Sequence, residues 1–136
     1  MGLLEVEVAV SAGSLRPGAS GGVVMPHAWT PGGVVVESAF TGAHLLLLAP
    51  AGCVLNDVYR EAAALEIDID GVLVRASGAL DTTTWESTGV SYHVEVDSPA
   101  NGEVIDELLG VVEDVAEIPK TLRAGTTVVR GKSLAG

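Results

Sequence analysis

Cysteine is almost absent from this chain of 136 residues, in which Cys53 is the single thiol. One cysteine cannot form a disulfide within a monomer, so Cys53 is either a reactive sulfur or a small buried hydrophobe. An unpaired thiol fits a reducing compartment. The first residues also lack the basic region and apolar core of a secretory signal. Both features predict a cytoplasmic protein.

Basic residues are scarce as well, with 7 Lys and Arg against 18 Asp and Glu and a net charge of −11. This charge repels a phosphate backbone and anionic lipid, so we expect neither nucleic acid nor a membrane as a partner. No apolar run reaches the roughly 20 residues that span a bilayer. The leucine-rich stretch near Leu45 is interrupted by Pro50, Gly52 and Asn56.

Aromatic residues are few, although 48% of the chain is hydrophobic. The core is therefore expected to consist of Val, Leu and Ala. The surplus of apolar residues predicts a covered subunit interface, and hence a homodimer.

The length fits one domain over residues 1–136. Alternating apolar and polar residues predict a strand at 3–11. Two short valine runs between Gly- and Pro-containing loops, at 22–25 and 33–37, predict two more strands, and we expect the three to form a small sheet of their own. A helix is expected over about 42–65, and a long hairpin from residues 66–80 and 89–97. An amphipathic helix from a cap near Ser98 to about Ala116, a turn of helix at Pro119 and a strand at 126–130 follow. The predicted class is α+β.

Helical geometry places Cys53 on the polar side of the helix predicted at 42–65. Asn56, Asp57 and Arg60 share that side with Cys53. The opposite, apolar face comprises Leu47, Ala51, Val54, Leu55, Val58, Ala62 and Leu65. Arg60 would favour the thiolate of Cys53 and Asp57 would disfavour it. The three polar residues could equally form a buried network that fixes the helix in a dimer.

Pro50 either kinks this helix or begins it. If the helix restarts at Pro50, Cys53 lies in the first turn, where the helix dipole would lower the pKa of the thiol.

The histidines give weaker signals. His44 is nine residues before Cys53, on the opposite helical face unless Pro50 bends the helix, so a cap or interface role competes with a Cys-His dyad. His27 and His93 are isolated in strand-like sequence and share no metal-binding spacing with other candidates, so we expect no metal. No dinucleotide-binding glycine motif precedes a helix, and we expect no cofactor.

The chain resembles the OsmC/Ohr family of organic hydroperoxide reductases over about residues 32–130. The resemblance rests on a leucine-rich helix carrying Ala51-Gly52-Cys53, a hairpin ending in Val96-Asp97-Ser98-Pro99-Ala100, and an amphipathic helix before Ile118-Pro119. It implies antiparallel sheets around a central helix that bears the cysteine. It also implies an intertwined homodimer with active sites built from both subunits. By this resemblance Cys53 attacks the peroxide and Arg16 stabilises its thiolate.

Two positions depart from the family pattern. Thr41-Gly42-Ala43 replaces an Asn-Pro-Glu turn, so Ala43 stands where the family has the glutamate that orients the arginine. Ile118 precedes Pro119 where the family has its second, resolving cysteine. The chain is thus expected to be a divergent member in which an external thiol must reduce an oxidised Cys53.

Three functions remain open from the sequence. The first is a thiol-dependent reductase of small apolar organic hydroperoxides that uses Cys53 alone, with Asn56, Asp57, Arg60 and His44 lining the site. The second is a non-peroxidatic, small-molecule-binding protein of the same family that has lost the redox machinery. The third is a structural or regulatory dimer with an inert cysteine.

Overall fold

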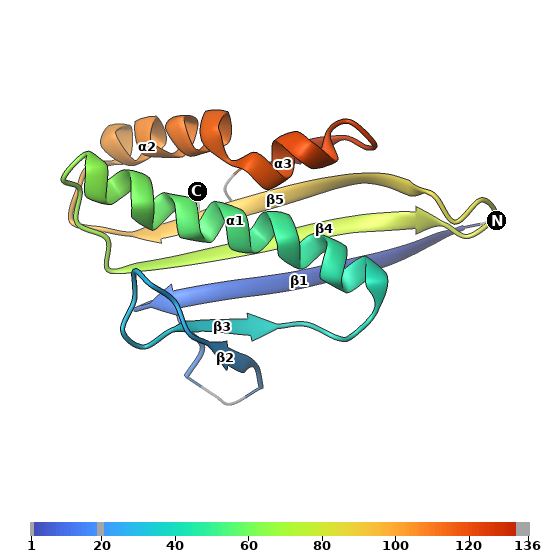
Figure 1. Cartoon of the computed structure of the whole chain (residues 1–136), viewed down its shortest axis with the longest axis horizontal. Helices are drawn as coiled ribbons and strands as arrows, with labels where there is room; N and C mark the ends of the chain where they lie inside the picture. Colours follow the sequence, from blue (N-terminus) through green and yellow to red (C-terminus); the bar gives the residue numbers. More distant parts are fainter. Residues whose placement is uncertain (1, 19–20, 133–136) are drawn as a thin grey trace.

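The computed structural model describes residues 2–18 and 21–132, which form one six-stranded sheet with helices on one of its faces (Figure 1). The elements follow in the order β1 (Leu3–Gly13), β2 (Val23–Met25), β3 (Val34–Glu37), α1 (Gly42–Ala64), β4 (Gly71–Asp81), β5 (Ser87–Asp97), α2 (Gly102–Val115), α3 (Glu117–Leu122) and β6 (Val128–Arg130). The predicted α+β class and order of elements are confirmed.

The strands lie in the order β2-β3-β1-β4-β5-β6. β1 pairs antiparallel with β4 along its whole length, from Leu3 opposite Asp81 to Gly13 opposite Gly71, and with β3 on its other side. The expectation of a separate N-terminal sheet is therefore wrong, because β1 is central rather than peripheral. The predicted hairpin of β4 and β5 is confirmed, and β6 adds to β5 in parallel.

The core lies between the sheet and its helices. Alternate residues of the central strands, such as Val10 and Val74, point to this layer because side chains alternate between the two faces of a strand. From α1 they meet Val54, Leu55 and Val58, all buried as the helical register predicted. Leu108 of α2 joins the same core.

Helix α1 runs without a break through Pro50. The side chain of Thr41 accepts a hydrogen bond from the backbone N–H of His44 and caps the first turn. Cys53 therefore lies in the middle of a 23-residue helix, so the alternative of a helix that restarts at Pro50 is wrong. Leu65, expected on the buried face, is instead the C-cap and is 52% exposed, because the helix ends one residue before it.

Helix α2 begins at the side-chain cap of Asn101, within the predicted cap segment 98–103, and ends at Val115. Ala116 is extended and turns the chain into the short helix α3, which packs against α1. This turn brings Glu117 and Ile118 to the part of α1 that holds Cys53. Within the described ranges, no helix is both long and apolar enough to cross a bilayer.

Candidate functional site

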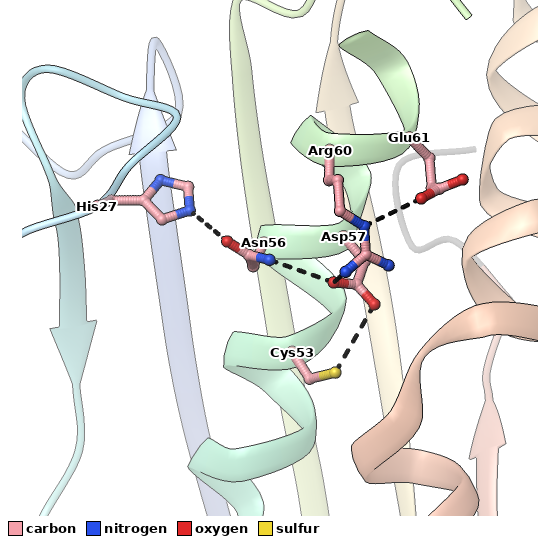
Figure 2. A network of polar contacts seen from close by, with 6 residues as sticks. All are labelled: His27, Cys53, Asn56, Asp57, Arg60 and Glu61. Atoms are coloured by element: carbon pink, nitrogen blue, oxygen red, sulfur yellow. Dashed lines mark hydrogen bonds and ion pairs between the residues drawn. The ribbon is translucent and has the colours of Figure 1, made fainter. Parts of the chain in front are cut away.

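The thiol of Cys53 is half-buried between α1 and the start of α3. Its Sγ–H donates to Oδ2 of Asp57, one turn further along α1, across 3.8 Å (Figure 2). Backbone N–H groups of Ile118 and Glu117 approach the sulfur from α3. The predicted proximity of Cys53 to a polar neighbour is thus confirmed, and the residue that replaces the family's second cysteine lies beside the thiol.

The environment of Cys53 favours the neutral thiol. Burial, and to a smaller extent the negative charges of Asp57 and Glu117, raise the pKa of Cys53 to about 11. Backbone hydrogen bonding from Ile118 and Glu117 acts in the opposite direction and only partly offsets this. The pKa is therefore not lowered by a helix N-terminus, since Cys53 is not in the first turn of α1.

Asp57 is fully buried, although the sequence placed it on the polar side of the helix. Its Oδ1 accepts a hydrogen bond from Nδ2 of Asn56 at 3.2 Å and forms an ion pair with Nη1 of Arg60, also at 3.2 Å. Burial raises the pKa of Asp57, while the partners Asn56 and Arg60 lower it. Three of the predicted lining residues, Asn56, Asp57 and Arg60, are thus brought together with Cys53 as one network.

The network extends to His27, to which the sequence assigned no role in the site. Nε2 of His27, in the loop after β2, lies 3.1 Å from Oδ1 of Asn56 (Figure 2). Nδ1 of His27 lies 2.9 Å from Oγ1 of Thr30, and its ring packs edge-on against Tyr59. Nothing in sequence spacing signals this contact, because it depends on the loop between β2 and β3 reaching α1 from the edge of the sheet.

Arg16 and His44 make other contacts. Nη1 of Arg16, in the loop after β1, donates to the backbone oxygen of Gly32 at 2.8 Å. His44 lies in the first turn of α1, where its Nδ1 is 2.6 Å from Oγ1 of Thr41. His44 therefore has the predicted cap position, two turns of helix before the thiol. In the single chain, neither residue is among the groups that shift the pKa of Cys53.

An apolar groove of about 240 Å³ lies beside the network, between α1 and the β2–β3 hairpin. Leu48, Gly52 and Leu55 of α1 form one wall, and Met25 and His27 contribute to the other. Within the described part of the chain, Cys53 does not line this groove itself. Its thiol faces the start of α3, on the other side of α1 from His27, which lines the groove (Figure 2).

The sulfur of Cys53 and the carboxylates of Asp57 and Glu117 lie within 4.8 Å of one another. The carboxylate of Asp57 is already engaged by Arg60, Asn56 and the thiol, and backbone N–H groups face the sulfur. We therefore assign no metal site to this cluster. The arrangement instead suits the movement of a proton between a thiol and a buried carboxylate.

A helix that carries a cysteine against a sheet of this strand order defines a class of thiol proteins, and comparisons with known proteins give the family. The sequence profile of the OsmC-like protein family matches residues 36–129. The chain belongs to the OsmC-like family. No curated protein matches the sequence.

Solved structures agree with this assignment of the fold. An OsmC-like protein from Mycoplasma pneumoniae is similar with a TM-score of 0.61 at 20% identity, over 75% of this chain and 82% of that one. An organic hydroperoxide resistance protein from Legionella pneumophila gives 0.59 at 18% identity, over 71% of each chain. The organic hydroperoxide resistance protein OhrB of Bacillus subtilis gives 0.54 at 19% identity, over 69% and 70%. The predicted OsmC-like fold is confirmed, although the single chain has one sheet with its helices on one face rather than antiparallel sheets around a central helix.

Proposed function

We propose that this protein is a thiol-dependent reductase of organic hydroperoxides in which Cys53 is the peroxidatic cysteine and Asp57 accepts its proton. The observation that carries the proposal is the contact of 3.8 Å between Sγ of Cys53 and the buried Oδ2 of Asp57. Membership of a family that includes hydroperoxide resistance proteins supports the same chemistry.

Asp57 is the proposed base that removes the proton of this high-pKa thiol. A thiol with a pKa of about 11 holds little thiolate at neutral pH, so it needs a base at the moment of attack. Burial makes the carboxylate of Asp57 a stronger base than an exposed aspartate. The backbone N–H groups of Glu117 and Ile118 stabilise the negative charge that develops on sulfur.

The proposed reaction takes two stages. Cys53 gives its proton to Asp57 while the sulfur attacks the distal peroxide oxygen, the O–O bond breaks, and the leaving alkoxide takes the proton from Asp57. The products are the sulfenic acid of Cys53 and an alcohol. A first external thiol then forms a mixed disulfide with Cys53 and releases water. A second external thiol displaces Cys53 as a thiol and leaves with the first as a disulfide.

The groove and the subunit arrangement complete the proposal. The apolar walls of the groove suit the hydrocarbon part of a hydroperoxide. We further propose that the protein is a single-domain, cytoplasmic homodimer. The family resemblance assigns thiolate stabilisation to Arg16, and in a dimer that role would require a contact other than the one with Gly32 in the single chain.

The test is the rate at which cumene hydroperoxide oxidises Cys53, followed by mass spectrometry of the dimedone adduct of the sulfenic acid. Asp57→Asn keeps the shape of the side chain but cannot accept the proton, so we expect oxidation to slow by about 100-fold or more. Asp114→Asn, on the exposed side of α2, is the matched control and should not change the rate.

The same variant can contradict the proposal. The charge of Asp57 raises the thiol pKa, so removing that charge alone would make Cys53 more acidic. If Asp57→Asn oxidises as fast as the unmodified protein or faster, Asp57 is not the proton acceptor.

A second candidate function is a non-peroxidatic, small-molecule-binding protein. The raised pKa of Cys53 favours it, as do Ala43 and Ile118 at the positions of the family's glutamate and second cysteine. Absence of a dimedone adduct after peroxide treatment, together with binding of an apolar fluorescent probe in the groove, would favour this function.

A further inference from the structure

Only one assignment of donors and acceptors fits the hydrogen bonds that lead from Asp57 to His27. The carboxylate of Asp57 cannot donate, so Asn56 must present its NH₂ group to Asp57 and its oxygen to His27. Nε2 of His27 therefore carries a proton and donates to Oδ1 of Asn56. In the neutral ring, Nδ1 is then unprotonated and accepts from the hydroxyl of Thr30.

We propose that His27 is a positioning residue of the Cys53 site, which holds the amide of Asn56 so that its NH₂ group stays bonded to the carboxylate of Asp57. His27 does not touch the sulfur. It acts through two hydrogen bonds in series (Figure 2). Thr30 and Tyr59 hold its ring in place.

The consequence concerns the charge on Asp57. Arg60 from α1 attracts the carboxylate, whereas Glu117 from α3 repels it and the thiol of Cys53 donates to it. Asn56 is the neutral partner that favours the charged form, and it lowers the pKa of Asp57. An amide released from His27 is free to rotate, and Asp57 then loses this donor. His27 thus keeps the carboxylate in the ionised state that can take a proton.

The position of His27 also connects two parts of the site. The same ring lines the apolar groove together with Met25, Pro26 and Leu48. A molecule in the groove therefore contacts a residue that holds Asn56. This inference rests on the proposed function for its catalytic meaning, but the hydrogen-bonded chain itself can be tested without any peroxide.

The test is the pH titration of the Asp57 side-chain carboxyl carbon by ¹³C NMR in the full chain. His27→Phe keeps a ring against Tyr59 but removes the donor to Asn56, so the midpoint for Asp57 should rise by about half a pH unit or more. His27→Gln, which restores an N–H donor, should return the midpoint toward that of the unmodified protein. His93→Phe is the matched control, since His93 bonds to the Lys132 backbone oxygen and should leave Asp57 unchanged.

An unchanged midpoint in His27→Phe, or an equal rise in His93→Phe, would overturn the inference. If His27→Phe does not fold, Thr30→Val removes the hydroxyl that fixes the ring and should raise the midpoint in the same direction. Failure of the proposed function would give a different experimental result. If the midpoint follows His27 while Cys53 does not react with cumene hydroperoxide, His27 positions Asp57 and only the peroxidase function is wrong.

Discussion

Asp57 and Cys53 form a pair in which the charge of Asp57 raises the pKa of the thiol, whereas the hydrogen bond from the thiol lowers the pKa of Asp57. Each is desolvated, and the pKa of each is raised mainly for that reason. A pair of this kind retains a proton more strongly than two exposed groups would. That property suits a thiol that reacts as it transfers its proton, rather than one stored as a thiolate.

The pH dependence of Cys53 follows from the direction of its shift. Because the pKa of Cys53 rises from its ordinary value of 9.0 to about 11, the folded state binds this proton more tightly than the unfolded state. The resulting stabilisation is complete below pH 9 and is lost as the pH rises through about 11. We expect chemical denaturation to show a larger loss of stability between pH 8.5 and pH 11 for the unmodified protein than for Cys53→Ser.

Alkylation gives an independent measurement of the same group. The rate with iodoacetamide should rise with a midpoint near pH 11. A midpoint at or below the free value of about 8.5 would contradict this prediction and would indicate that a cation outside the single-chain environment reaches the sulfur.

At the scale of elements, helix α1 has to serve the core and the site at once. Its buried face packs on β1 and β4. The polar network lies on another side of the helix, at Asn56, Asp57 and Arg60. Burial of Asp57 arises because α3 covers that side of α1, so that a face polar in sequence is enclosed in the fold. The packing of α1 therefore fixes the geometry of the thiol.

Leu55 tests this dependence. Its side chain is fully buried in the core and also lines the apolar groove. We expect Leu55→Ala to lower the free energy of unfolding by about 2–5 kcal/mol, because the cavity it leaves cannot close completely. Leu65→Ala, at the exposed C-cap of the same helix, should change it by less than about 0.5 kcal/mol. Similar losses for the two variants in urea denaturation would contradict this account of the core.

At the scale of the whole molecule, the single chain leaves many large apolar side chains exposed. Phe40, just before α1, is 85% exposed. Others on β2 and in the first turns of α1 are Val23, Val24, Met25, Leu45 and Leu46. Apolar patches of this kind are typical of interaction surfaces.

We predict a homodimer that buries more than about 2,000 Å² in total, the size typical of obligate dimers. Light scattering at micromolar concentration should give twice the mass of the chain, and Phe40→Lys should shift the population toward monomer by placing a charge at the interface. Glu103→Lys, on the exposed side of α2, controls for the change in charge. A monomeric mass for the unmodified protein would show the prediction to be wrong.

The sequence by itself determined the order of the elements and the buried face of α1. Strand and helix periods are local properties, so residues such as Val54 and Val58 could be placed in the core from their spacing alone. The same register correctly set Asn56, Asp57 and Arg60 beside Cys53. The resemblance to the OsmC-like family rested on motifs in this part of the chain.

Only the tertiary structure decided the properties of the site. Three features of the site depend on residues that are distant in sequence. These are the burial of Asp57, the approach of Glu117 and Ile118 to Cys53, and the contact of His27 with Asn56. The continuity of α1 through Pro50 was equally undecided, because proline is compatible with both a helix start and a helix interior packed on a sheet. These features depend on how β1, the β2–β3 hairpin and α3 pack around α1. This packing raises the pKa of Cys53. The position of Cys53 in the helix, taken alone, was compatible with either a raised or a lowered pKa.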